Sequence, residues 1–261
     1  MKRLIAILCA LGGLAAFAQA AKAPAKAPAK APAQKRLVLH YTFDEPVGKE
    51  VKDHSGNNIH GTVLLGSEGL LKSVPGRVGN AFFFAGVRNP VKDGLVNPQI
   101  STNKVWTAEL LDGMTIEFWI KLGPEADWQR GLMNLVVCAP GNYGPPFVVT
   151  YLWNMIVVHY EPGKDSNFRA KYSQDIRNQW RHVAITYDGA TKTSRIYLDG
   201  DLRCEKTGLA MDPPKSKNPT LTVGGAFGGK GSGLNGAIDE LKIYNYPMTQ
   251  EEIIQHAKFT D

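Results

Sequence analysis

The chain has 261 residues, of which 43% are hydrophobic and 21% are charged, and its net charge is +6. This length suits one large all-β domain or two small domains, and it does not choose between them. The positive charge lies at the N-terminus, because no acid precedes Asp44 and residues 37–261 alone carry a net charge of −1. A nucleic-acid-binding domain carries its basic residues on the folded part, so this distribution argues against nucleic acid as a partner.

Residues 1–20 have the pattern of a secretory signal peptide. Two basic residues are followed by an apolar run that ends at Phe17 and by the small-x-small cleavage site Ala18-Gln19-Ala20. The run is too short to span a bilayer, and no later segment reaches the ~20 apolar residues of a transmembrane helix. We therefore expect a mature chain that begins at Ala21, has no membrane span, and is secreted, periplasmic or at the cell surface.

Residues 21–36 repeat a Lys-Ala-Pro-Ala unit. Proline at every fourth position prevents a helix and favours an extended, semi-rigid spacer. Its five basic residues allow a weak, nonspecific contact with anionic envelope polymers, although a solubilising linker is the simpler interpretation. The folded domain is expected to cover residues 37–261.

From residue 37 onward the dominant pattern has a period of two, which is typical of β-strands. Strands are expected at Leu37–Phe43 and Met114–Leu122, and a hairpin is expected within Arg181–Gly200 around the turn dipeptide Asp188-Gly189. Further strand candidates are "GTVLL", "NAFFFAG", "NLVVCA", "NMIVVHY", "FRAKYS", "TLTVGG" and "AIDELKIYN". Short strands separated by Gly, Pro and Asn clusters predict antiparallel sheets packed as a sandwich or jelly roll.

The C-terminus departs from this pattern. In "TQEEIIQHA" Thr249 is followed three residues later by Glu252, which forms a capping box, and Ile253 and Ile254 would dock a short closing helix.

Two cysteines, Cys138 and Cys204, remain after removal of the signal. An exported context permits a disulfide between them, and burial as free thiols is an equal alternative. Neither has a second Cys or a His at metal-ligand spacing, which argues against zinc.

Five blocks in order resemble the laminin-G-like jelly-roll domains of the concanavalin A-like lectin/glucanase superfamily. They are "LVLHYTFDEPVGKEVKDHSGNNIHGTV", "GRVGNAFFFAG", "MTIEFWIK", "QWRHVAITYDGATKTSRIYLDGDLR" and "TLTVGGAFGGKGSGLNGAIDELKIYNYPMTQEEI". The resemblance implies an all-β jelly-roll sandwich of two antiparallel sheets with a short C-terminal helix, and often a calcium site. It implies recognition of sugars or proteins more often than catalysis, but fold membership alone does not fix the function.

The resemblance also implies where calcium would bind. The acid after the first strand, the Asp/Ser/Gly/Asn loop that follows and the acid of the last strand commonly meet, which points to Asp44, Asp53, Asn57 and Asp239. Flexible Asp/Asn loops offer the hard oxygens that calcium prefers. The alternative is that Asp53 and Asn57 simply form side-chain-to-backbone turn bonds.

A catalytic acid pair is not expected. Asp239 and Glu240 are adjacent on a strand, so alternation would send their side chains to opposite faces, and the E-x-D-x-x-E run of related glucanases does not occur. The remaining case for an enzyme is a polar, aromatic groove, which would form if Glu117 and Trp119 share a face with His182, Arg195 and Tyr197.

The leading hypothesis is an exported, non-enzymatic recognition module that binds a glycan or a cell-surface protein and holds a structural calcium. Trp128, Tyr143 and Trp153 are the candidates for stacking against a sugar, although each also suits the core or a loop anchor. The alternatives are a polysaccharide-active hydrolase that uses the Glu117 face and a structural component of a surface assembly.

Overall fold

The computed structural model of the protein describes residues 34–87, 89–102, 108–124, 133–138, 147–152, 154–159, 168–172, 176–209, 211 and 220–258. Contacts from Gln34 onward group into one unit. Trp128, Tyr143, Trp153 and the expected signal peptide lie outside the described residues. Among the residues that are described, no helix is long and apolar enough to cross a bilayer.

The described chain is built almost entirely from strands, as the period-two pattern predicted. The strands are β1 (Leu37–Tyr41), β2 (Glu50–Val51), β3 (Gly61–Leu64), β4 (Leu71–Pro75), β5 (Asn80–Ala85), β6 (Gln99–Thr102), β7 (Gly113–Leu122), β8 (Met133–Cys138), β9 (Phe147–Leu152), β10 (Met155–His159), β11 (Phe168–Lys171), β12 (Trp180–Asp188), β13 (Thr193–Leu198), β14 (Asp201–Lys206), β15 (Leu221–Val223) and β16 (Asn235–Tyr244). Two short 3-10 turns, η1 (Ala108–Leu111) and η2 (Phe227–Gly229), and the helix α1 (Gln250–Ala257) complete the described elements.

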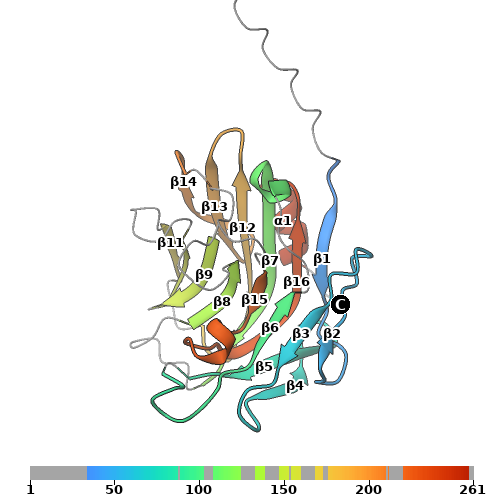
Figure 1. Ribbon diagram of the computed structural model, residues 1–261. Helices are drawn as coiled ribbons and strands as arrows, with labels where there is room; N and C mark the ends of the chain where they lie inside the picture. The colour runs from blue at the N-terminus through green and yellow to red at the C-terminus, as the bar shows by residue number, and fades with distance from the viewer. Residues whose placement is uncertain are drawn as a thin grey trace, which may run out of the picture. The chain divides into compact units, whose positions relative to one another are not determined.

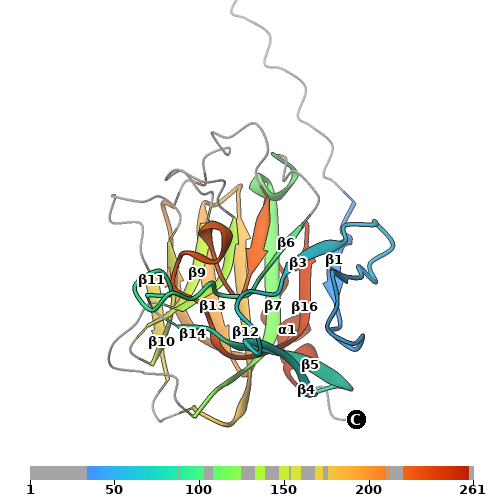
Figure 2. The ribbon, with the colours of Figure 1, turned by 60° about the horizontal axis from the view of Figure 1, so that its bottom comes forward.

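These strands form two antiparallel sheets, and Figures 1 and 2 show their order. The first sheet runs β14-β13-β12-β7-β16-β5-β4, and β1 also pairs with β16. The second sheet runs β11-β10-β9-β8-β15-β6-β3-β2. One edge of β16 pairs with β7, and the other edge pairs with two strands: its first half with β5 and its second half with β1. This order places the first and the last strand of the described chain, β1 and β16, side by side.

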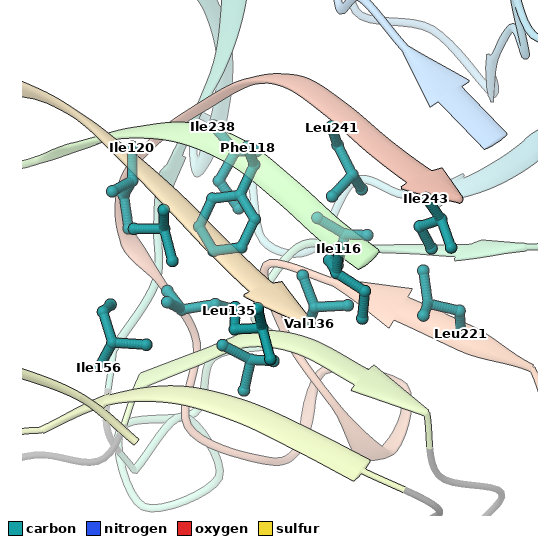
Figure 3. Packing of buried hydrophobic residues seen from close by; sticks show 14 of the residues in the cluster. Ile116, Phe118, Ile120, Leu135, Val136, Ile156, Leu221, Ile238, Leu241 and Ile243 are labelled. Atoms are coloured by element: carbon teal, nitrogen blue, oxygen red, sulfur yellow. The ribbon is translucent and has the colours of Figure 1, made fainter. Parts of the chain in front are cut away.

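The core lies between the inner faces of the two sheets (Figure 3). Alternate residues of β7, including Ile116 and Phe118, meet Leu135 and Val136 of β8 and Ile156 of β10, and all five side chains have no exposed surface. Burying one such side chain contributes about 1.5–3 kcal/mol relative to leaving it in water. The predicted apolar face of the segment Met114–Leu122 is therefore confirmed as the core face.

Helix α1 closes the outer face of the first sheet, which is the face turned away from the second sheet. Its capping box forms as predicted, because Thr249 accepts a hydrogen bond from the Glu252 backbone N–H while the Glu252 side chain accepts one from the Thr249 N–H. Ile253 is fully buried in a small cluster with Ala184, Tyr197 and Met248. A second, smaller apolar layer thus fixes the helix on the sheet.

Strands β2, β4, β6, β9 and β14 were not among the sequence candidates. β9 lies in the mostly apolar stretch from Phe147 to His159, where no Gly or Pro marks the turn to β10. Asn154, with φ 59°, takes the left-handed conformation in that turn instead of a glycine. On β14, Cys204 is a free, half-buried cysteine, and the side chain of Cys138 lies outside the described part.

The prediction that Asp239 and Glu240 point to opposite faces is wrong. A β-bulge shifts the register of β16 on β7, so that Asp239 faces Trp119 but Lys242 faces Glu117. Glu240 has φ 49° and takes up the extra residue of the bulge. Because Ile238 and Leu241 both pack in the core, the two acids between them lie on the outer side of the sheet.

Candidate functional site

A polar pocket lies on the outer face of the first sheet. We call it the Glu117 pocket, and its volume is about 120 Å³. A water needs ~10–15 Å³ measured in this way, so the pocket has room for several waters or for part of a small polar ligand. Its lining comes from three strands, the turn between β4 and β5, and α1: Val78, Glu117, Trp119, His182, Glu240, Lys242, Tyr244 and His256.

Strand register places these side chains together. Glu117 and Trp119 are two residues apart on β7, so they share a face. Trp119 stands opposite His182 of β12, and Glu117 stands opposite Lys242 of β16. Of the residues that the sequence suggested for a polar groove, Glu117, Trp119 and His182 therefore line one pocket. Arg195 and Tyr197 are not part of its lining, and Tyr197 packs in the cluster with Ile253.

The Glu117 carboxylate lies between two imidazoles and is only 2% exposed. Its Oε1 lies 2.8 Å from His256 Nδ1 and accepts a hydrogen bond from the Tyr244 hydroxyl at 3.3 Å. Its Oε2 lies 3.5 Å from His182 Nε2, which is too long for a strong hydrogen bond, and no other described residue gives it a polar partner. This oxygen is a buried acceptor that is only weakly satisfied.

The imidazoles decide the ionisation of Glu117. Burial acts to raise the pKa of its carboxyl, but the hydrogen bonds and charges of His182 and His256 outweigh burial and lower the pKa to about 2. The hydrogen bond that Glu117 accepts from His256 in turn raises the pKa of His256 above its usual value, against the opposing effect of burial. Glu117 and His256 therefore form a partly buried ion pair that links the sheet to α1.

A second pairing stands at the edge of the pocket. Glu240 Oε2 lies 2.6 Å from Lys242 Nζ and 3.0 Å from His40 Nε2. Burial acts to raise the pKa of Glu240, but His40 and Lys242 lower it below its usual range. Glu240, for which the sequence suggested no role, is thus an ionised carboxylate held between two basic groups.

The indole of Trp119 is already in contact on its face and its edge. The Arg77 guanidinium lies 4.9 Å from the indole centroid, and the ring centroids of Trp119 and His182 are 5.2 Å apart in an edge-on arrangement. With an exposure of 8%, Trp119 offers little surface for stacking against a sugar ring.

Asp239 and Asp44, two of the predicted calcium ligands, both anchor the turn between β4 and β5. Asp239 Oδ2 accepts hydrogen bonds from the Arg77 and Val78 N–H groups, and Asp44 Oδ1 accepts one from the Asn80 N–H. Full burial of Asp239 raises the pKa of its carboxyl to about 7, although the backbone donors act in the opposite direction. This turn forms one wall of the Glu117 pocket through Val78.

Asp53 and Asn57, the other two predicted ligands, belong to a turn beside β1. The Asp53 carboxylate accepts hydrogen bonds from the N–H groups of His40, Ser55 and Ile59. The Asn57 amide donates to the carbonyl oxygens of Leu37 and Val38. Burial acts to raise the pKa of Asp53, but these backbone donors lower it.

The four predicted calcium ligands thus appear as two pairs, each hydrogen-bonded to a different turn. Within the described ranges, no group of three or more His, Cys, Asp or Glu side chains is arranged to hold a metal ion. The side chains in both pairs already serve backbone donors or acceptors, which is the turn-forming alternative that the sequence left open. Calcium binding by this chain stays a prediction.

Some members of the pocket could not be found from local pattern. His256 and Lys242 carried no signal as partners of Glu117 and Glu240, and His40 lies 200 positions from Glu240.

Comparison with known families agrees with this architecture. The family model described as the concanavalin A-like lectin/glucanases superfamily matches residues 97–254, which is more than half of the chain. A curated relative, the sushi, von Willebrand factor type A, EGF and pentraxin domain-containing protein 1 of Rattus norvegicus, is 24% identical over 170 residues. These residues cover 60% of this chain but only 5% of that protein.

Two solved structures illustrate the fold. Domain 4 of AbnA, an extracellular GH43 arabinanase from Geobacillus stearothermophilus, was solved in complex with arabinotriose. Its structure matches this chain with a TM-score of 0.60 and 18% sequence identity, and the match covers 86% of this chain and 99% of the AbnA domain. The binding domain of botulinum neurotoxin DC, in complex with rat synaptotagmin II, has a TM-score of 0.60 and 17% identity, and covers 86% of this chain and 52% of that one. Identities this low establish the fold alone.

Proposed function

Because the chain belongs to the concanavalin A-like lectin/glucanases superfamily, we propose that it is an exported recognition module that binds a carbohydrate without cleaving it. The observation that carries the proposal is the state of the acids on the outer face. The two carboxylates that line the pocket, Glu117 and Glu240, both have lowered pKa values and are paired with basic groups.

Glycoside hydrolysis needs one carboxyl that stays protonated to donate to the leaving group and a second that acts as base or nucleophile. The lowered pKa values of Glu117 and Glu240 keep both carboxyls ionised, so neither suits the role of general acid. A histidine or a lysine also pairs with each carboxylate, so neither is a free nucleophile. Asp239 has a raised pKa, but it has no exposed surface and its oxygens serve backbone donors. These features favour binding over the alternative of a polysaccharide-active hydrolase.

Similar structures support a binding role in general terms. The AbnA domain was solved with arabinotriose, which is a carbohydrate, and the botulinum domain with synaptotagmin II, which is a protein. A cell-surface protein is therefore the second candidate ligand. In either case residues 1–20 would direct export, and the Lys-Ala-Pro spacer would hold the domain away from the envelope while touching anionic polymers weakly.

The test is a glycan array probed with the full chain, with and without calcium. Binding of defined glycans supports the proposal. If no glycan binds but a surface-protein partner is captured, the protein-binding alternative or a structural role in a surface assembly replaces it.

A separate assay addresses catalysis. Polysaccharides that bind on the array are incubated with the full chain, and reducing ends are measured. Release of reducing ends that Glu117→Gln abolishes would overturn the proposal in favour of a hydrolase.

A further inference from the structure

We infer that the Glu117 pocket is the binding site for one uncharged sugar unit, which it recognises through hydrogen bonds to hydroxyl groups. This inference rests on the proposed function and specifies its site and ligand class. It concerns the outer face of the first sheet, beside α1, and involves none of the aromatic residues that the sequence suggested for stacking.

The pocket has unsatisfied hydrogen-bonding capacity in its wall. Within the described part of the chain, His182 Nδ1 is buried without a hydrogen-bond partner, and Glu117 Oε2 has only the long 3.5 Å contact with His182 Nε2; both side chains line the pocket. Most buried polar atoms in proteins are satisfied, so an unsatisfied pair beside a cavity indicates a missing water or ligand group. A small shift of the side chains would present Glu117 Oε2 as an acceptor to a hydroxyl group, and His182 Nδ1 as a donor or an acceptor according to its tautomer.

The groups nearest solvent can donate and accept. The side chains of Lys242 and His256 are 23% and 38% exposed, and the Glu240 side chain is 13% exposed. Lys242 uses one of its three donors on Glu240, which leaves donors for a ligand oxygen. Glu240 offers carboxylate lone pairs beside it. A sugar hydroxyl both donates and accepts, so it matches this mixed set.

Each carboxylate of the pocket is balanced by a basic partner. Glu117 pairs with His256, and Glu240 pairs with Lys242 and His40. A site for an anionic or a cationic ligand would have an excess of the opposite charge, because burying an unpaired charge is costly. Balance therefore favours an uncharged ligand over a sialic acid, a uronic acid or an amine.

The size of the pocket limits the ligand. Its volume of about 120 Å³ is well below the ~300–1,000 Å³ of pockets that enclose a drug-sized molecule. The hydroxyl-bearing edge of one sugar unit can enter, whereas the rest of an oligosaccharide would have to remain outside. Since Arg77 and His182 already contact the Trp119 indole, recognition depends on hydroxyl geometry instead of stacking.

The experiment titrates the full chain with three sugars of one ring geometry and different charge: D-galactose, D-galacturonate and D-galactosamine, with the corresponding glucose series in parallel. Isothermal titration calorimetry measures the affinities. We expect the uncharged sugar of at least one series to bind more tightly than its two charged counterparts.

Two variants each remove one charge from the pocket. Lys242→Met removes the ammonium and keeps the length of the side chain, and Glu240→Gln removes the carboxylate charge and keeps its shape. Loss of one charge-assisted hydrogen bond should weaken binding of the uncharged sugar about tenfold. Lys242→Met should also shift the preference toward the amine, and Glu240→Gln toward the uronate. Lys52→Met, an exposed lysine between β2 and β3, is the matched control and should bind like the wild type.

Thermal melts of all variants establish that they are folded. Suppose that the wild type binds glycans on the array, but Lys242→Met and Glu240→Gln bind the monosaccharides as tightly as the wild type and Lys52→Met do. The pocket is then not the site, while the proposed function stands. If the wild type binds no carbohydrate on the array or in solution, the proposed function and this inference both fail.

Discussion

Glutamine in place of Glu117 should remove a pH-dependent part of the stability of this fold. Glu117 is an acid whose pKa falls from 4.5 in the unfolded chain to about 2 in the folded protein, where His182 and His256 flank it. Each unit of pKa corresponds to about 1.4 kcal/mol, so the ionised carboxylate contributes about 3 kcal/mol. That is a large fraction of the ~5–15 kcal/mol that stabilises a typical domain.

The pH range follows from the direction of the shifts. Because the folded pKa of Glu117 is depressed, its contribution is complete above the unfolded pKa of 4.5 and disappears as the pH falls toward 2. The pKa of His256 is raised, so its contribution is complete below 6.5 and decreases as the pH rises through the folded pKa. Wild-type stability from this ion pair should therefore be greatest between about pH 4.5 and 6.5.

Urea unfolding of the wild type and Glu117→Gln, followed by circular dichroism at a series of pH values, measures this effect. The difference in unfolding free energy should be about 3 kcal/mol larger near pH 6 than near pH 2. Glu205→Gln, which removes an exposed carboxylate paired with Arg195, should change stability by less than about 1 kcal/mol at every pH. A Glu117→Gln difference that is the same at both pH values would refute the assignment of Glu117 as a histidine-paired carboxylate.

Three further predictions concern the helix cap, the turn beside the pocket and calcium. Thr249→Ala breaks the capping box and should cost about 1 kcal/mol in urea unfolding, whereas an unchanged midpoint would mean that α1 does not depend on its cap. Gly79→Ala should lower the melting temperature more than Gly69→Ala: both glycines have positive φ, but a Cβ at Gly79 would overlap Asp44 Oδ1, while one at Gly69 meets no atom within 4 Å. Equal effects would show that Asp44 does not hold this turn. Calcium should raise the melting temperature and EDTA lower it if the predicted site exists. If scanning calorimetry shows no shift with either, the chain has no calcium site.

The sequence alone predicted the features that depend on local pattern. Alternation identified the core face of β7, because side chains of a strand point to opposite sides whatever the partner strand. Thr249 and Glu252 identified the start of α1, because both halves of a capping box lie within one turn of helix. The same periodicity correctly placed Glu117 and Trp119 on one outer face.

Only the tertiary structure decided the composition of the pocket. The bulge at Glu240 arises from the pairing of β16 with β7, and alternation within β16 cannot reveal it because an extra residue appears only relative to the partner strand. The contact of His256 with Glu117 joins residues 139 positions apart. Ionisation states, pairing and the charge balance of the Glu117 pocket depend on such contacts, since burial and neighbouring charges set a pKa only once the chain has folded.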